Sequence, residues 1–325
     1  MTTDFVPQTP SDWRRLAQQA MQENRADAAL DAWRELLWLR ADDKEAILET
    51  ARLEQARGGV KPAIELLQSA LRRSPEDEDY HLQLGLLWLE LAEWDKAEHH
   101  LHYADSDERA EAALAQLRQQ RGHLSPAYAR HLFNDYAPRF DEALAKLGYQ
   151  APQLLAQLLQ PYLQNRSHMA IADLGCGTGL MAPYLRAHAR ELVGVDIAEK
   201  MLEQARQRGG YDSLLHLDMV AALNRPYELI VAADALVYVG ALEALLQAVA
   251  TCLPMGGLFA ASVEVNGLTQ GFTLQDSKRY AHSRDYIEKL GKSCGLWLKE
   301  WQPAVLRQDR QQPIEGALFL LVRMP

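Results

Sequence analysis

The residues with the clearest chemical pattern are Ile171-Ala172-Asp173-Leu174-Gly175-Cys176-Gly177-Thr178-Gly179. The apolar residues up to Leu174 predict a buried strand. The three alternating glycines let the backbone turn sharply and approach a ligand where no side chain would fit. An acid at the end of a buried strand is costly unless it is paired, and a ligand's ammonium group is a natural partner for Asp173, directly or through backbone N–H groups. The pattern predicts a ligand-binding loop.

The spacing of the glycines separates this loop from two nucleotide-binding loops. G-x-G-x-G differs from the G-x-G-x-x-G of dinucleotide folds, and no Gly-Lys-Ser/Thr for a nucleotide phosphate is present. A glycine-rich loop alone is also compatible with simple turn chemistry. The segments that follow therefore decide between a turn and a binding site.

These residues resemble motif I of the class I S-adenosylmethionine-dependent methyltransferases, and the next segments follow in that family's order. The resemblance implies that Asp196, after a second strand, takes the ribose hydroxyls, and that Asp218 and Met219, after a third strand, contact the adenine. It implies S-adenosylmethionine as the cofactor. The cofactor-binding residues that we predict are Tyr128, Tyr136, Asp173, Gly175, Cys176, Gly177, Gly179, Asp196, Ile197, Met201, Asp218, Met219 and Ala233.

Strands and helices alternate after the glycine loop, which predicts a doubly wound α/β sheet. The last two strands, 297–306 and 316–322, are joined by a short segment containing Pro313 that cannot hold a crossover helix, so we expect an antiparallel pair. The resemblance implies seven strands in the order 3-2-1-4-5-7-6, with the last strand antiparallel. We expect the other strands at 169–174, 191–196, 213–217, 227–232 and 257–265, and helices at 180–189, 198–208 and 241–252.

The first 120 residues repeat with a period of 34, which is the period of the tetratricopeptide repeat. Small residues recur at the positions where paired helices would cross closely, and the segment 107–120 predicts a closing helix. Together with the later motifs, this resembles a bacterial group of methyltransferases that contain tetratricopeptide (TPR) repeats. The aligned small residues are Ala17, Ala51 and Gly85, and Ala29, Ala63 and Ala97.

We predict three regions: TPR-like helical repeats with a cap helix at 1–122, a helical lid or linker at 123–168, and the methyltransferase domain at 169–325. Gly122 is suited to end the cap helix, and Ser125 is suited to cap the next helix, with Pro126 as its first residue. We base these boundaries on the change in composition and on the residues that are suited to begin or end a helix.

The segment Asn134–Asp141 resembles the aromatic lid motif of several small-molecule methyltransferases. Aromatic rings such as Tyr128 and Tyr136 exclude water from a sulfonium and attract it through their faces. The same tyrosines could instead pack a helix onto the sheet. Both interpretations fit the sequence.

Composition narrows the class of partner. The net charge is −10, and residues 1–122 carry 24 acidic and 15 basic residues. This acidic composition lacks the basic surface that a nucleic-acid-binding protein needs. It favours a basic protein or peptide as the partner, or it simply reflects a solvated helical surface. The three cysteines have no metal-ligand spacing, so we predict no metal site. No signal segment or membrane-length apolar run occurs, so we expect a cytoplasmic protein that does not enter a membrane.

Methyl transfer from a sulfonium is a direct displacement in which alignment and exclusion of water contribute most. An oxygen or amine acceptor also needs a base, and the candidates are Tyr238, Glu264 and His282, with Asp234 as a fourth. Each has an ordinary alternative. Ser283 is suited to cap a helix, which would make His282 a helix-entry residue; Glu264 could simply end a strand; and nearby backbone could satisfy Asp234.

We therefore predict methyl transfer to a nitrogen or oxygen of a protein that the repeats recruit. One alternative is a small-molecule O- or N-methyltransferase whose repeats serve oligomerisation, as in a homo-oligomer, or brace the domain. Another is a non-catalytic scaffold that binds the cofactor. The segment 266–280 lacks periodicity and is expected to be a loop that forms one wall of the acceptor site.

Overall fold

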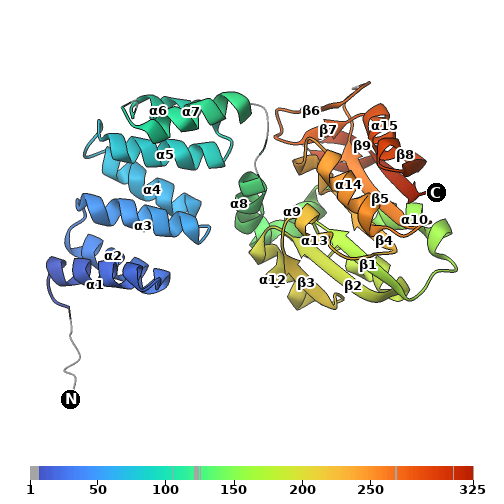
Figure 1. Cartoon of the computed structure of the whole chain (residues 1–325), viewed down its shortest axis with the longest axis horizontal. Helices are drawn as coiled ribbons and strands as arrows, with labels where there is room; N and C mark the ends of the chain where they lie inside the picture. The colour runs from blue at the N-terminus through green and yellow to red at the C-terminus, as the bar shows by residue number, and fades with distance from the viewer. Residues whose placement is uncertain are drawn as a thin grey trace, which may run out of the picture. The chain divides into compact units, whose positions relative to one another are not determined.

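The computed structural model describes residues 7–104, 106–120, 124, 126–267, 269–309 and 311–324. The expectations for Gly122 and Ser125 lie outside these residues. The chain divides into two compact units, Met1–Arg121 and Gly122–Pro325, whose elements are labelled in Figure 1. No helix in the described ranges is long and apolar enough to cross a membrane.

The first unit contains helix pairs that begin at regular intervals. The first helices of the pairs start at residues 10, 44 and 78, and the second helices at 26, 60 and 94, so both series have intervals of 34 residues. A further helix follows the three pairs. The helices are α1 (Pro10–Gln22), α2 (Ala26–Leu39), α3 (Lys44–Ala56), α4 (Val60–Leu71), α5 (Glu78–Glu90), α6 (Trp94–His102) and α7 (Glu108–Gln120).

Capping and packing in this unit follow the same interval. Thr9, Asp43 and Asp77 cap the first helix of each pair by accepting a hydrogen bond from the backbone N–H three residues on. The two helices of the third pair approach closely, because a Cβ added at Gly85 would lie 2.6 Å from Cγ of Leu101. The small residues of the 34-residue pattern therefore lie at helix contacts.

The second unit is built on one sheet. Strands β3, β2, β1, β4 and β5 are parallel neighbours in that order, β9 pairs antiparallel with β5, and β8 pairs antiparallel with β9. With β8 and β9 counted as the sixth and seventh strands, this is the expected order 3-2-1-4-5-7-6. The strands are β1 (Met169–Leu174), β2 (Ala189–Asp196), β3 (Ser213–His216), β4 (Leu229–Ala232), β5 (Leu258–Glu264), β6 (Phe272–Leu274), β7 (Tyr280–His282), β8 (Leu296–Asp309) and β9 (Gln312–Arg323).

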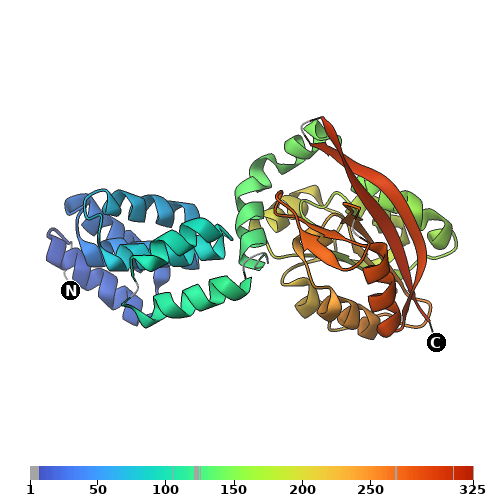
Figure 2. The ribbon, with the colours of Figure 1, turned by 90° about the horizontal axis from the view of Figure 1, so that it is seen from above.

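Two details differ from the expectation. The segment 266–280 is not simply a loop, because it contains β6 and leads into β7, which joins β5 through the pair Glu264 and Ala281. The last two strands are also longer than expected, and Figure 2 shows them as a long curved pair in red. Pro313 lies inside β9, opposite Gln308; proline is tolerated at such a strand end because little of the ladder depends on its missing N–H.

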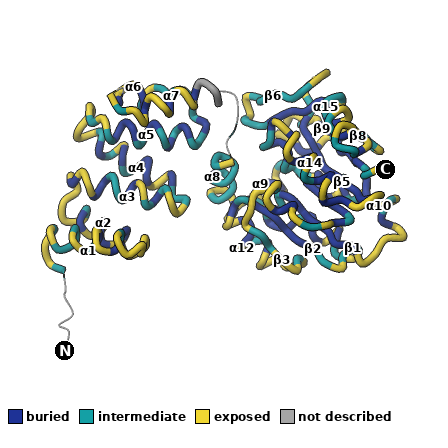
Figure 3. Tube along the Cα trace, viewed as in Figure 1, coloured by how far each residue is buried: buried dark blue, intermediate teal, exposed yellow. Residues whose placement is uncertain are grey.

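Side chains of the parallel strands alternate between two hydrophobic cores. In β1, Ala170, Ala172 and Leu174 face the core formed with α14 and α15, while Met169 and Ile171 face the core formed with α10 and α11. Every residue of the central strands β1, β4 and β5 is buried (Figure 3). Helices thus cover both faces of the sheet, as a doubly wound fold requires.

The remaining helices connect the strands or precede the sheet. The helix expected at 180–189 is shorter, because it ends in a 3-10 turn before β2. The helices are α8 (Pro126–Tyr136), α9 (Phe140–Lys146), α10 (Ala151–Leu163), α11 (Ala182–Leu185), α12 (Glu199–Arg208), α13 (Met219–Ala222), α14 (Glu243–Cys252) and α15 (Arg284–Ser293), with 3-10 turns η1 (Ala137–Arg139), η2 (Arg186–His188) and η3 (Leu236–Tyr238).

Candidate active site

A cavity of about 390 Å³ lies at the carboxyl ends of the parallel strands of the second unit. Residues that directly follow β1, β2, β3 and β4 line it, as expected for an open α/β sheet. Of the predicted cofactor residues, those that line the cavity are Asp173, Gly175, Cys176, Gly177, Asp196, Ile197, Asp218, Met219 and Ala233.

The glycine loop is shaped by left-handed backbone. Gly175 has φ 67° and Gly177 has φ 54°, values that side chains disfavour. A Cβ on Gly175 would lie 2.5 Å from the Cβ of Ala235, whereas a Cβ on Gly177 would meet only the Phe140 ring at 3.9 Å. Gly175 is therefore required by packing, and Gly177 leaves bare backbone at the cavity. Gly179, also predicted, packs against the side chain of Tyr211 and does not line the cavity.

Asp173 is buried at the end of β1 and has one open acceptor. Its Oδ2 accepts a hydrogen bond of 2.6 Å from the hydroxyl of Tyr211, while Oδ1 has no hydrogen-bond partner in the described structure. Burial raises the pKa of Asp173 to about 7, although the Tyr211 hydrogen bond acts in the opposite direction. An orphaned, buried carboxylate oxygen beside a cavity fits the ammonium group of a ligand.

Asp196 ends β2 and is held by backbone. Its Oδ2 accepts from the N–H of Gly177 at 2.9 Å, and its Oδ1 accepts from the N–H of Ala198 at 2.8 Å. Burial raises its pKa, against the effect of these hydrogen bonds. Each carboxylate oxygen keeps a second lone pair, so the fixed carboxylate can still accept two ligand hydroxyls.

Asp218 lies at the third strand end and caps α13. Its Oδ1 accepts from the N–H of Val220 at 2.8 Å, and the residue is exposed. The neighbouring Leu217 and Met219 also line the cavity. An acid beside two apolar side chains suits a flat, polar-edged ring such as adenine.

The lid helices contribute different aromatics from those predicted. Phe133 and Phe140 line the cavity, and their rings meet edge to face at 5.9 Å. Tyr136 is 40% exposed, and Tyr128 is also absent from the cavity wall. Met201 is fully buried beneath these phenylalanines. Both phenylalanines lie in the region 123–168 predicted as a helical lid or linker, and the two predicted tyrosines in that region do not line the cavity.

An acid bridges the lid and the glycine loop. Oδ1 of Asp141, at the start of α9, accepts a hydrogen bond of 2.6 Å from the Thr178 hydroxyl, and its Oδ2 pairs with Arg208 of α12. These contacts tie the second lid helix to the loop. The lid phenylalanines are thereby fixed over the cavity.

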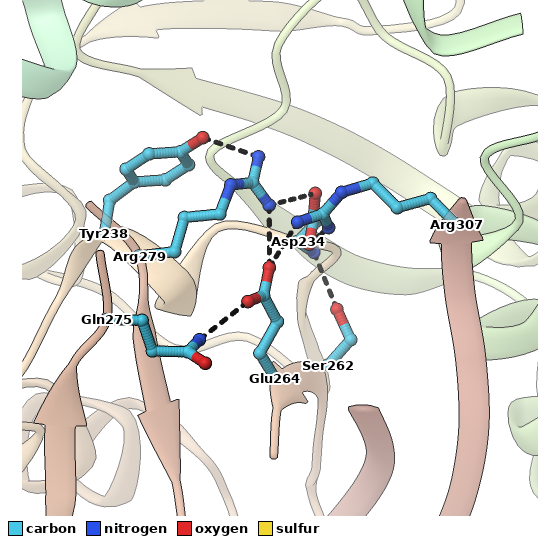
Figure 4. A network of polar contacts seen from close by, with 7 residues as sticks. All are labelled: Asp234, Tyr238, Ser262, Glu264, Gln275, Arg279 and Arg307. Carbon is cyan, nitrogen blue, oxygen red and sulfur yellow. Dashed lines mark hydrogen bonds and ion pairs between the residues drawn. The ribbon is translucent and has the colours of Figure 1, made fainter. Parts of the chain in front are cut away.

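The cavity wall beyond β4 is a network of charged groups (Figure 4). Arg279 and Arg307 both contact Asp234 and Glu264. The Arg279 guanidinium also donates a hydrogen bond of 2.6 Å to the hydroxyl of Tyr238. Two acids and two arginines balance in charge, so each of these charged side chains has an opposite charge beside it. Asp234, Tyr238 and Arg279 line the cavity, whereas Arg307 does not.

Two of the three predicted base candidates do not reach the cavity. Glu264 is 4% exposed and is occupied by both arginines and by Gln275, which donates at 2.9 Å. His282 is fully buried, and its Nε2 lies 3.0 Å from the carbonyl oxygen of Gly240. Burial lowers its pKa, which keeps the imidazole neutral. Of the three, only Tyr238 lines the cavity.

Two aromatic residues that line the cavity, Phe133 and Tyr149, were not among the predicted site residues. Arg279 lies in the segment 266–280, which was expected to form a wall of the acceptor site, and its partner Tyr238 is 41 positions away in the sequence. Burial raises the pKa of Tyr149 well above its ordinary value, so its phenol stays protonated. In the sequence, only the presence of several aromatic residues in and near α8 indicated that Phe133 and Phe140 could line a cavity.

Comparison with known proteins agrees with this architecture. Residues 145–296 match the model of a family described as a methyltransferase domain. The human methyltransferase-like protein 27 is 40% identical over 102 residues, which are 31% of this chain and 42% of that protein. An uncharacterized protein of Haemophilus influenzae is 33% identical over 155 residues, covering 42% of this chain and 61% of that one. The chain therefore spans less than two thirds of either relative.

One solved structure is similar to this chain at low sequence identity. The 1,6-didemethyltoxoflavin-N1-methyltransferase of Burkholderia thailandensis, with bound S-adenosylhomocysteine, is 15% identical and covers 62% of this chain and 91% of its own, with a TM-score of 0.49. The assignment of this chain rests on the family match together with the cavity. The second unit has the fold of class I S-adenosylmethionine-dependent methyltransferases, and residues 145–296 form a methyltransferase domain that uses S-adenosylmethionine as its cofactor.

Proposed function

We propose that the whole protein transfers the methyl group of S-adenosylmethionine to an acceptor bound beside Tyr238 and Arg279. The observation that carries this proposal is the open Oδ1 of buried Asp173 next to the bare backbone of Gly177 and the fixed Asp196. These groups would hold the ammonium, the methionine part and the ribose of the cofactor. The cofactor supplies an activated methyl group, and the protein aligns it and excludes water.

Calorimetry with S-adenosylmethionine tests the cofactor assignment. Asp196→Ala removes the carboxylate that would accept two ribose hydroxyls, and we expect the dissociation constant to rise by roughly 100-fold, because hydrogen bonds to charged groups contribute about 1.5–3 kcal/mol each. Glu199→Ala, which removes an exposed acid three positions later, is the matched control. Unchanged affinity in Asp196→Ala, with a normal circular dichroism spectrum, would refute the assignment.

For the first unit we propose TPR repeats that recruit a protein acceptor. The support is the 34-residue interval of helix starts and caps, together with the acidic composition of the unit. The test compares the full chain with the second unit alone, Gly122–Pro325, which is compact by itself. We expect removal of the first unit to abolish methylation of a protein acceptor and to leave cofactor binding intact.

A small-molecule acceptor is the second candidate. The observation that favours it is the limited size of the cavity, about 390 Å³, with Phe133 and Phe140 in its wall. In that case the repeats would brace the domain or form an oligomer. Methyl transfer in a cell extract that is then separated by size distinguishes the two candidates. A small-molecule acceptor would carry the labelled methyl group in the low-molecular-weight fraction, and a protein acceptor would carry it in the protein fraction.

A further inference from the structure

We propose that the methyl acceptor is a carboxylate, held by Arg279 and Tyr238, and that the product is a methyl ester. This inference rests on the proposed methyl transfer and names the chemical class of its acceptor. It follows from where these two residues lie, from the donors that they leave open, and from the lack of an available base among the described residues on their side of the cavity.

The strand order separates a cofactor side from an acceptor side. Asp196 and Asp218 follow β2 and β3, which lie on one side of β1 in the sheet. Tyr238 follows β4 and Arg279 precedes β7, and both of these strands lie on the other side of β1. A cofactor whose nucleoside occupies the β2 and β3 ends and whose ammonium reaches Asp173 at β1 leaves the Arg279 side of the cavity for the acceptor.

Arg279 presents hydrogen-bond donors to this side. Its three contacts, with Asp234, Glu264 and the Tyr238 hydroxyl, use three of the five N–H donors of a guanidinium, which leaves two for a ligand. The side chain is 19% exposed at the cavity, and the acids hold it from behind. A planar cation fixed in this way is suited to bind a carboxylate.

Tyr238 adds a second donor. Its oxygen accepts a hydrogen bond from Arg279, so its own proton is not needed in that contact. Burial raises the pKa of Tyr238 to about 12, against the opposing effect of Arg279, and the hydroxyl therefore stays protonated at neutral pH. A protonated phenol next to a guanidinium donates hydrogen bonds to an anion, and it is poorly suited to act as a general base.

The other acids and the histidine near these two residues are poorly suited to remove a proton. Asp234 lines the cavity, but one of its oxygens faces Arg279 at 3.3 Å and the other faces Arg307 at 3.4 Å, so taking up a proton would cost the carboxylate its ion pairs. Glu264 and His282 do not line the cavity. A carboxylic acid, whose ordinary pKa is about 4, is already ionised at neutral pH and needs no base.

The step balances without proton transfer. A carboxylate oxygen attacks the methyl carbon, a C–O bond forms, the C–S bond breaks, and its electron pair goes to sulfur. An anion and a sulfonium become a neutral ester and a neutral thioether. Arg279 and Tyr238 hold the carboxylate so that one oxygen points at the methyl carbon.

The test uses the full chain, methyl-labelled S-adenosylmethionine and a cell extract separated by size into small-molecule and protein fractions. Methyl esters release labelled methanol in mild alkali, whereas N-methyl and ether O-methyl groups do not. We expect alkali-labile label, and its fraction distinguishes a small acid from a protein carboxyl group. Alkali-stable label would overturn the carboxylate class but leave methyl transfer intact. No label in any fraction would overturn both.

A variant connects the label to the named residues. Tyr238→Phe removes only a hydroxyl, and Tyr184→Phe, at an exposed tyrosine outside this cavity, is the control. In Tyr238→Phe we expect the KM for the labelled acceptor fraction to rise about 10-fold or more, with the dissociation constant of S-adenosylmethionine within about twofold of wild type. An unchanged KM would overturn the proposal. A raised dissociation constant for S-adenosylmethionine with an unchanged acceptor KM would instead indicate that Tyr238 and Arg279 contact the cofactor.

Discussion

Replacing Asp173 with asparagine should stabilise the free protein at alkaline pH and weaken its binding of S-adenosylmethionine. Asparagine has the same shape and keeps an acceptor for the Tyr211 hydroxyl. It cannot ionise. The variant therefore removes the cost of a buried charge together with the charge that the ligand's ammonium requires.

The size of the first effect follows from the pKa. Burial raises the pKa of Asp173 from 3.8 to about 7, so the folded state holds a proton that the unfolded state has lost between these pH values. Wild-type stability should therefore fall as pH rises from about 4 to about 7 and then level off. At about 1.36 kcal/mol per pH unit this amounts to roughly 4 kcal/mol. The variant should lack this contribution.

The second effect has the opposite consequence for the ligand. A cationic ligand binds the ionised form of Asp173, so wild-type affinity for S-adenosylmethionine should increase as pH rises to about 7. The asparagine variant should bind roughly 10- to 100-fold more weakly, because a hydrogen bond to a charged group contributes about 1.5–3 kcal/mol. S-adenosylhomocysteine carries the same ammonium and should lose affinity equally.

The assay is urea denaturation of both proteins from pH 5 to pH 8.5, with calorimetry of both ligands at each pH. The difference between the two stability curves isolates Asp173, because Asp196, whose pKa burial also raises, is present in both proteins. We expect the difference to grow from pH 5 to about pH 7. Parallel curves would refute the pKa argument, and equal ligand affinity would refute the ammonium contact.

Two further pairs of substitutions separate packing from cofactor binding and test the charged network. Gly175→Ala should destabilise the domain by about 2 kcal/mol or more in denaturation experiments, because the added Cβ would lie 2.5 Å from the Cβ of Ala235 on a residue with positive φ. Gly177→Ala should mainly weaken the binding of S-adenosylmethionine, as measured by calorimetry. Glu264→Gln should lower stability by about 3 kcal/mol, because buried Arg307 and partly buried Arg279 would then share one acid. The exposed Glu142→Gln should change stability by less than about 0.5 kcal/mol. Equal losses in the two glycine variants, or in the two glutamine variants, would contradict these expectations.

The cofactor half of the site could be predicted because each residue directly follows a strand. Asp173, Gly175 and Gly177 lie within five positions, and parallel strands bring their carboxyl ends, here with Asp196 and Asp218, to the same edge of a sheet. The alternation of strands and helices is visible in the sequence, and the strand order was implied by the family resemblance. They place backbone and strand ends without any knowledge of side-chain partners.

The acceptor half could not be predicted in this way because its contacts are long-range. Arg307 pairs with Asp234 across 73 positions, and β6 and β7 have three residues each, too few to show a period. A histidine near a strand end indicates acid–base chemistry, but nothing local in the sequence shows that His282 is sealed by Phe272 and Tyr286. Glu264 and His282 were proposed as bases because their strand positions could be predicted, whereas the partners that keep them away from the cavity could not.

The distribution of charge across the cavity connects its two halves. On the cofactor side, Asp173 and Asp196 accept hydrogen bonds from a phenol and from backbone N–H groups, so their charge is left for a cation. On the other side, Asp234 is matched by arginines, which leaves donors for an anion. A sulfonium and a carboxylate that react between these walls lose their charges in the transition state. Because such a reaction has less charge to solvate as it proceeds, a cavity wall with apolar residues such as Phe133 and Phe140 favours it over the same reaction in bulk solvent.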